Sequence, residues 1–138
     1  MKNLVAVYGS LRKDMANHDL LKGRSTYMGK FDTNPVFDMY GLGRFPGLVK
    51  GTTSILMEVY KVNDAVLSEI DELEGYHPNS VDSPFYKRVN INTSYGLAYT
   101  YLYQSSIINA PKVLDGDWKN FYEQNVSLRK LLENAEII

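Results

Sequence analysis

The sequence of 138 residues contains no cysteine and only two histidines, His18 and His77. Disulfides, thiolate nucleophiles and zinc sites built on sulfur are therefore excluded, and two histidines are too few for a histidine-rich metal site. We expect neither a metal nor a cofactor. The formal net charge is only −1, so no global charge draws the protein to nucleic acid or to an anionic membrane.

Long hydrophobic runs are also missing near the N-terminus. The apolar run Leu4–Val7 is too short for a signal-peptide core and has no small-residue cleavage site after it. We therefore expect a cytoplasmic protein with no membrane partner. A content of 44% hydrophobic and 22% charged residues excludes a disordered chain, a coiled coil and a fibrous repeat. The 11 tyrosines are unusual and predict a tyrosine-rich β core or pocket.

The pattern along the chain predicts one domain over residues 1–138, because no repeat, low-complexity tract or linker divides it. A helix is predicted over 63–73, with Asn63 as its N-cap and Gly75 after its end. Ser10 or Asp14 could cap a short helix that runs to Leu21, and 117–132 has weaker helical periodicity. Strands are predicted over 4–8, 55–62, 86–92 and 97–103, with short strands and turns over 27–49. This order favours an α+β fold, with a mixed or antiparallel sheet or a small barrel flanked by helices.

The first candidate site follows the first strand, in the sequence Tyr8-Gly9-Ser10-Leu11-Arg12. Consecutive backbone N–H groups at a strand-to-helix turn form an anion-binding concavity. The alternative is an ordinary strand–loop–helix connection with glycine in the left-handed conformation. The local sequence alone favours this alternative. The segment is neither a nucleophile elbow nor a phosphate-binding loop, because it lacks the residues that those motifs require after the serine.

The second candidate is Glu74, at the end of the helix predicted over 63–73. At about 100° per residue, Glu74 falls near the apolar positions Leu67 and Ile70 and leans toward the core. Partial burial at the negative end of a helix dipole is expected to raise the pKa of its carboxyl group, which suits proton transfer near neutral pH. The alternative is that the last turn frays and the side chain enters water. The other acidic residues of this segment, Glu69, Asp71 and Glu72, are interpreted as solvated surface charges.

Two further segments carry polar or aromatic side chains that could line a pocket. Arg44 and Phe45 lie in a glycine-rich loop over 41–47, for which an ordinary surface loop is the favoured interpretation. Tyr86 and Arg88 share one face of a predicted strand, as pocket residues or as simple cross-strand partners. The tyrosines at 99, 101 and 103 share a face too, which is more typical of packing than of base stacking.

The order of these motifs resembles the γ-glutamylcyclotransferase-like family, in its AIG2-like, γ-glutamylamine cyclotransferase branch. The resemblance covers nearly the whole chain, through Tyr8-Gly9-Ser10-Leu11-Arg12, Phe45-Pro46-Gly47-Leu48-Val49, Leu73-Glu74-Gly75-Tyr76, Tyr86-x-Arg88 and Gly116-Asp117-Trp118. It implies a small mixed β-barrel with helices outside, and a cavity between the first motif and Glu74. It also implies a reaction in which the α-amine of a γ-glutamyl group attacks its own γ-carbonyl and releases 5-oxoproline and an amine.

By this resemblance Glu74 is the general acid and base, and the glutamyl-binding loop consists of Tyr8, Gly9, Ser10 and Leu11. Arg12, Tyr86 and Arg88 are further candidates for substrate binding. The expected partner is a small γ-glutamyl compound; the leaving amine and the oligomeric state stay open. A non-catalytic member of the same fold, which binds a small carboxylate or a protein partner, is the main alternative. A single-stranded nucleic-acid binder is a weaker one.

Overall fold

The computed structural model describes residues 2–77 and 85–134, with side chains described as far as residue 126. Its elements in chain order are β1 (Asn3–Val7), η1 (His18–Leu20), β2 (Thr26–Asp32), β3 (Phe37–Gly41), β4 (Pro46–Lys50), β5 (Leu56–Val62), α1 (Asp64–Leu73), β6 (Tyr86–Thr93), β7 (Gly96–Tyr103) and α2 (Trp118–Asn134). The strands predicted over 4–8, 55–62, 86–92 and 97–103 are therefore confirmed, with small differences at their ends. The helix predicted over 63–73 is confirmed as well.

The strands form two sheets. The larger has the order β2-β5-β1-β7-β6, and the smaller is the β3–β4 hairpin. Strand β1 pairs antiparallel with β5 but parallel with β7, which makes the larger sheet mixed. The α+β class is confirmed. Among the described residues no pairing joins the edge strands β2 and β6, so closure of the predicted small barrel is not detected.

Helix α1 forms where local sequence signals agree. The Asn63 side chain accepts a hydrogen bond from the backbone N–H of Val66 at 2.9 Å, which caps the N-terminus. Val66, Leu67 and Ile70 are buried against the sheet. Gly75 then adopts φ +70°, a left-handed conformation that ends the helix and that glycine adopts without steric cost.

The helix predicted from Ser10 or Asp14 to Leu21 is not present in that form. Asp14 has φ +68°, which interrupts any α-helix at this position. The chain instead makes successive turns, in which Arg12 N–H bonds to the Gly9 carbonyl and Met15 N–H to that of Arg12, both at 3.0 Å. Only η1, a single turn of 3-10 helix, follows. This segment therefore wraps as a loop rather than projecting as a helix.

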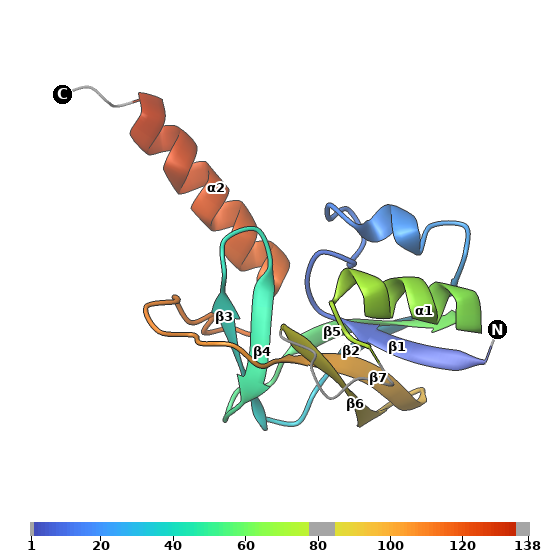
Figure 1. The fold of residues 1–138 in the computed structure, drawn as a ribbon. Coiled ribbons are helices and arrows are strands. Elements are labelled where there is room, and N and C mark those ends of the chain that lie inside the picture. Colours follow the sequence, from blue (N-terminus) through green and yellow to red (C-terminus); the bar gives the residue numbers. More distant parts are fainter. Residues whose placement is uncertain (1, 78–84, 135–138) are drawn as a thin grey trace.

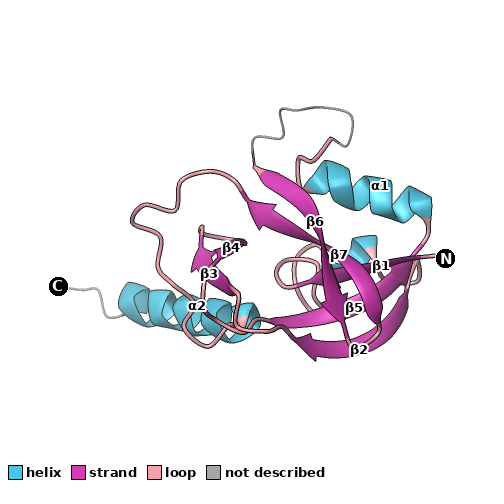
Figure 2. Ribbon diagram, turned by 90° about the horizontal axis from the view of Figure 1, so that it is seen from below, coloured by secondary structure: helices cyan, strands magenta, loops and turns pink. Residues whose placement is uncertain are grey.

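The larger sheet separates two apolar clusters. One lies beneath α1 and η1, and the other lies between the larger sheet, the β3–β4 hairpin and the first turn of α2. Figure 1 shows α1 over one part of the sheet and α2 extending away beyond the hairpin. Figure 2 shows the hairpin beside α2, with both on the same side of the larger sheet. Trp118, which is fully buried, anchors the start of α2. No helix in the described ranges is long and apolar enough to cross a bilayer.

Candidate active site

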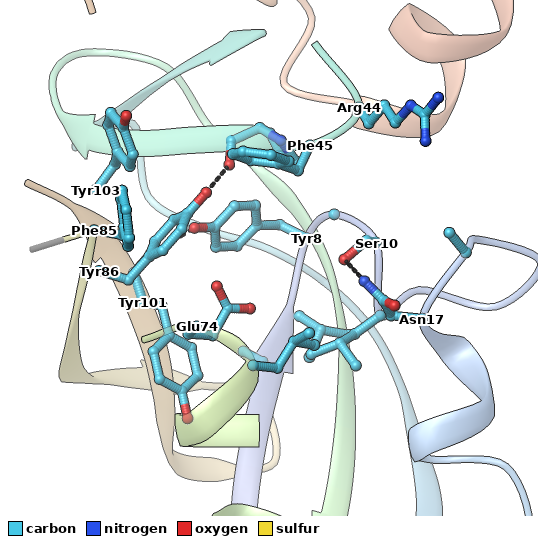
Figure 3. Close-up of a pocket in the computed structure, with 17 residues that line it drawn as sticks. Tyr8, Ser10, Asn17, Arg44, Phe45, Glu74, Phe85, Tyr86, Tyr101 and Tyr103 are labelled. Carbon is cyan, nitrogen blue, oxygen red and sulfur yellow. Dashed lines mark hydrogen bonds between the residues drawn. The ribbon is translucent and has the colours of Figure 1, made fainter. Parts of the chain in front are cut away.

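A cavity of about 460 Å³ lies where the two sheets meet. Its wall consists of the turn after β1, the end of α1, the start of β6, the end of β7 and the loop between β3 and β4. Figure 3 shows the side chains that line it. The volume is within the range of small-ligand sites, roughly 300–1,000 Å³.

Glu74 lines this cavity at the C-cap of α1. The last turn of the helix is closed, since Glu74 N–H bonds to the Ile70 carbonyl at 3.0 Å and Gly75 N–H to that of Glu72 at 3.1 Å. The turn therefore does not fray, and the side chain is half-buried with its carboxylate toward the aromatic wall (Figure 3). Burial first, and the negative charge of Asp71 second, raise the pKa of Glu74 to about 7.

The turn after β1 forms another wall of the same cavity, through Tyr8, Gly9, Ser10 and Leu11. Asn17 holds the turn, because its Nδ2 donates to Ser10 Oγ at 2.9 Å and its backbone N–H donates to the Ser10 carbonyl at 2.8 Å. Within residues 2–77 and 85–134, no acceptor is found for the backbone N–H groups of residues 9, 10 and 11. These N–H groups can therefore bind an anionic or carbonyl oxygen of a ligand.

Gly9 is required by packing rather than by its backbone angle. Its φ is outside the left-handed region, contrary to the alternative of an ordinary strand–loop–helix connection. A Cβ atom at this position would lie 2.7 Å from both Cδ and Cγ of Pro46. The absence of a side chain at residue 9 therefore lets the β3–β4 hairpin approach the end of β1.

Three buried tyrosines complete the wall, and each donates its hydroxyl hydrogen to a protein oxygen. Tyr8 donates to the Tyr101 carbonyl at 2.6 Å, Tyr86 to the Pro46 carbonyl at 2.7 Å, and Tyr101 to Asp71 Oδ1 at 2.6 Å. Burial, chiefly, raises the pKa of all three phenols above its ordinary value. They are therefore neutral, and they fix the shape of the cavity rather than supplying charge.

Arg12 does not line the cavity, in contrast to the sequence-based expectation. Its side chain is 2% exposed and points into the protein, where Nε bonds to Glu58 Oε2 at 2.8 Å and Nη1 to Asp117 Oδ1 at 2.9 Å.

Glu58 also accepts from Lys13 N–H at 2.9 Å and from the Tyr60 hydroxyl at 2.8 Å. Burial opposes ionisation of Glu58, but these hydrogen bonds outweigh it and lower its pKa. The only signal in the sequence for this buried pair is a glutamate between Met57 and Val59 in an apolar strand.

Arg88 is likewise outside the cavity lining. Its Nη1 contacts Asp71 Oδ2 at 2.6 Å, and its guanidinium lies over the rings of Tyr99 and Tyr76, at 4.4 and 5.2 Å from their centroids. Asp71 is only 5% exposed, so its interpretation as a surface charge is wrong. Asp71 also accepts a hydrogen bond from the Tyr101 hydroxyl, and its negative charge contributes to the raised pKa of Glu74.

The loop between β3 and β4 is part of the site, and its interpretation as an ordinary surface loop is wrong. Arg44, Phe45 and Pro46 all line the cavity. Their position depends on the hairpin packing over the end of β1, which a reading of the local sequence cannot show. Tyr86, which was predicted as a pocket residue, also lines the cavity and bonds to this loop.

The site combines a mixed sheet, one half-buried glutamate and an adjacent turn whose backbone N–H groups at residues 9–11 have no acceptor among the described residues. The chain matches the family model "Gamma-glutamyl cyclotransferase, AIG2-like" over residues 5–120. The protein therefore belongs to the γ-glutamylcyclotransferase family, in agreement with the resemblance of its motifs.

Similar proteins cover most of the chain. The Vibrio cholerae protein named "Putative gamma-glutamylcyclotransferase" is 40% identical over 119 residues, which are 86% of this chain and 96% of that protein. The "Gamma-L-glutamyl-butirosin B gamma-glutamyl cyclotransferase" of Niallia circulans is 30% identical over 131 residues, 92% of this chain and 81% of that protein. The crystal structure of an uncharacterized Pyrococcus horikoshii protein superposes with a TM-score of 0.75 and 26% identity, covering 91% of this chain and 98% of that one.

Proposed function

We propose that this protein is a γ-glutamylcyclotransferase that acts on a small γ-glutamyl compound. In the reaction the α-amine nitrogen of the substrate forms a bond to its own γ-carbonyl carbon. The bond between that carbon and the leaving amine breaks, and 5-oxoproline and a free amine are released. The name of the Niallia circulans relative, a γ-glutamyl cyclotransferase, supports this class of reaction.

The observation that carries the proposal is the placement of Glu74, with its pKa of about 7, in the same cavity as the turn over residues 9–11. A carboxyl group that titrates near neutrality both accepts and returns a proton. Glu74 therefore takes a proton from the substrate α-ammonium, and later delivers one to the departing amine.

The turn after β1 supplies the opposite half of the site in this proposal. The N–H groups of Gly9, Ser10 and Leu11 hold either the α-carboxylate or the oxyanion that develops on the γ-carbonyl. Because the attacking and attacked groups belong to one molecule, the protein needs mainly to fold the glutamyl chain and to move the proton. Tyr8 and Tyr86 shape the cavity around that folded chain.

The test is the variant Glu74→Gln, which keeps the size of the side chain and removes the base. We expect 5-oxoproline release from a panel of γ-glutamyl compounds, followed by mass spectrometry, to fall by roughly 10²-fold or more. Glu72→Gln, at an exposed position of the same helix, is the matched control and should keep full activity. Both variants should retain the circular dichroism spectrum of the parent.

Two results would contradict the proposal in different ways. Unchanged turnover in Glu74→Gln would remove the acid–base role from that residue. No turnover of any compound by the parent protein, together with saturable binding of a carboxylate ligand, would favour the non-catalytic alternative.

A further inference from the structure

A second cavity, of about 670 Å³, adjoins the first. The two cavities share Ser10, Ala16 and Arg44 in their walls. In Figure 3 Ser10 and Arg44 lie at the end of the first cavity that is remote from Tyr86. The second cavity then continues from these residues along the first turns of α2, so a ligand in the first cavity can extend into it.

The wall on α2 is aromatic. Trp118, Phe121 and Tyr122 are spaced to share one face of the helix, and all three line the second cavity. The ring centroids of Phe121 and Tyr122 lie 5.5 and 5.7 Å from that of Trp118. Trp118 is fully buried, and the rings of Phe121 and Tyr122 are half-buried beside it.

Charge does not distinguish ligands in this groove, because its rim carries one exposed side chain of each sign, Asp14 and Arg44. Pro111 and Met15 add further apolar surface to the wall. The wall is of mixed polarity, and the distinctive property that it offers a ligand is the aromatic patch on α2, against which an aromatic group can pack. Met15, Pro111 and Trp118 lie within the residues 5–120 that match the family model, and Phe121 and Tyr122 lie just beyond them.

We propose that the groove along α2 is the subsite for the leaving amine, and that it selects γ-glutamyl compounds whose amine part carries a large apolar, preferably aromatic, group. The inference rests on the proposed function. With the glutamyl part between Glu74 and residues 9–11, the amine part passes Ser10 and Ala16 and reaches the rings of Phe121 and Tyr122. Burial of an aromatic ring there stabilises the bound substrate.

The test compares γ-glutamylethylamide with γ-glutamyl-2-phenylethylamide, which differ only by a phenyl ring and carry no charge on the amine part. We expect kcat/KM for 5-oxoproline release to be about 10-fold or more higher for the phenyl compound. In Phe121→Leu, which keeps an apolar side chain but loses the ring, this preference should fall several-fold. Gln124→Leu, at an exposed position of α2 outside the groove, should keep it.

A second variant covers the case in which Phe121→Leu does not fold. Ala16 is exposed and lies between the two cavities, so Ala16→Gln should narrow the passage without disturbing the core. We expect it to slow the phenyl compound more than the ethyl compound. Equal kcat/KM values for the two compounds in the parent protein would overturn the inference and leave the proposed function intact.

Fluorescence separates the two proposals. Trp118 is the single tryptophan of the chain, so titration with free 2-phenylethylamine should change its emission, while ethylamine should not. A phenyl-specific change that Phe121→Leu abolishes supports the subsite when 5-oxoproline is also formed. The same change without 5-oxoproline from either compound would overturn both the proposed function and the leaving-amine assignment. No change, together with equal turnover, would overturn the subsite alone.

Discussion

The protonation of Glu74 is controlled by two neighbours of different kinds. The apolar and tyrosine-lined wall withdraws its carboxyl group from water, and Asp71 adds a negative charge one helical turn away. Both disfavour the ionised form and bring the pKa of Glu74 to about 7. Asp71 in turn accepts hydrogen bonds from Arg88 and from the Tyr101 hydroxyl. The behaviour of one residue is thus set by contacts from α1, β6 and β7.

This shift makes stability depend on pH. The pKa of Glu74 in the folded protein, about 7, is above the ordinary value of 4.5 that it has when unfolded. The folded state therefore holds this proton more tightly, and its contribution is complete below pH 4.5 and lost as pH rises through 7. As pH rises from 4.5 to 7, we expect the stability of Glu74→Gln relative to the parent to increase by about 2–3 kcal/mol. Urea unfolding of both proteins at several pH values measures this difference in unfolding free energy. A difference that does not change with pH would contradict the prediction.

Asp71 should affect the pH dependence of the activity through its charge, without contact with the substrate. Asp71→Asn keeps the shape and removes the negative charge, and it leaves the positive charge of Arg88 uncompensated. Both effects favour the ionised form of Glu74, so the acidic limb of the kcat/KM profile should move to lower pH by up to about one unit. The exposed variant Glu72→Gln provides the control. A limb that stays in place, or moves to higher pH, would show that Asp71 does not act on Glu74.

The contrast between Glu74 and Asp71 shows for which residues the sequence alone predicts the environment of the side chain. The direction of Glu74 follows from helical periodicity and from the glycine that ends the helix, both of which are local. The environment of Asp71 depends on Arg88 and Tyr101, which come from a different part of the chain and meet it only after the sheet forms. The same holds for Arg12, whose partners Glu58 and Asp117 are distant in sequence.

At the scale of elements, Arg12 joins three parts of the chain. Its guanidinium connects the turn after β1 to β5 through Glu58, and to the start of α2 through Asp117. Lys119, in the first turn of α2, also approaches Glu58, at 3.6 Å. This cluster adjoins the turn after β1, whose residues line the cavity, and it helps to fix the position of that turn.

Removal of Arg12 should therefore destabilise the protein strongly. Arg12→Met leaves the Glu58 carboxylate, which is 3% exposed, buried without its main cation. We expect the free energy of unfolding to fall by about 3–5 kcal/mol. Arg24→Met breaks an ion pair to Glu69 that is exposed on both sides and should have a much smaller effect. Equal effects of the two substitutions in thermal or urea unfolding would show that burial of the Arg12 pair does not matter.

Local sequence signals were sufficient to predict those helices and strands whose bounds are set by neighbouring residues. The Asn63 cap and the Gly75 terminus define α1, and the alternating runs define β6 and β7. The segment after β1 has helix-capping residues too, but Asp14 adopts a left-handed conformation and Asn17 bonds back to Ser10. Because of this backbone conformation and this hydrogen bond, the segment forms a loop beside the site instead of the predicted helix.

At the scale of the molecule, the cavity depends on how the two sheets meet. The β3–β4 hairpin approaches the larger sheet at Pro46, whose ring lies against Gly9 and whose carbonyl accepts from the Tyr86 hydroxyl. The resemblance of the motifs implies a cavity between residues 8–11 and Glu74, and these residues do line one cavity in the structure. It did not assign Pro46 to the site. Composition and periodicity do not give the docking of the hairpin, because it joins strands that are far apart in the sequence.

Gly9→Ala tests this docking directly. The new methyl group would overlap Pro46, since the nearest atoms would be 2.7 Å away, and the hairpin has to move outward. We expect a loss of about 1–3 kcal/mol in unfolding free energy and a several-fold increase in KM, because the cavity widens between residues 9 and 46. Gly23→Ala is the matched control: Gly23 has φ +71° and no atom within 4 Å of an added Cβ. Its replacement should cost about 1 kcal/mol through the backbone alone and leave KM unchanged. If Gly9→Ala retained both its stability and its KM, the close approach of hairpin and sheet would not be what shapes the site.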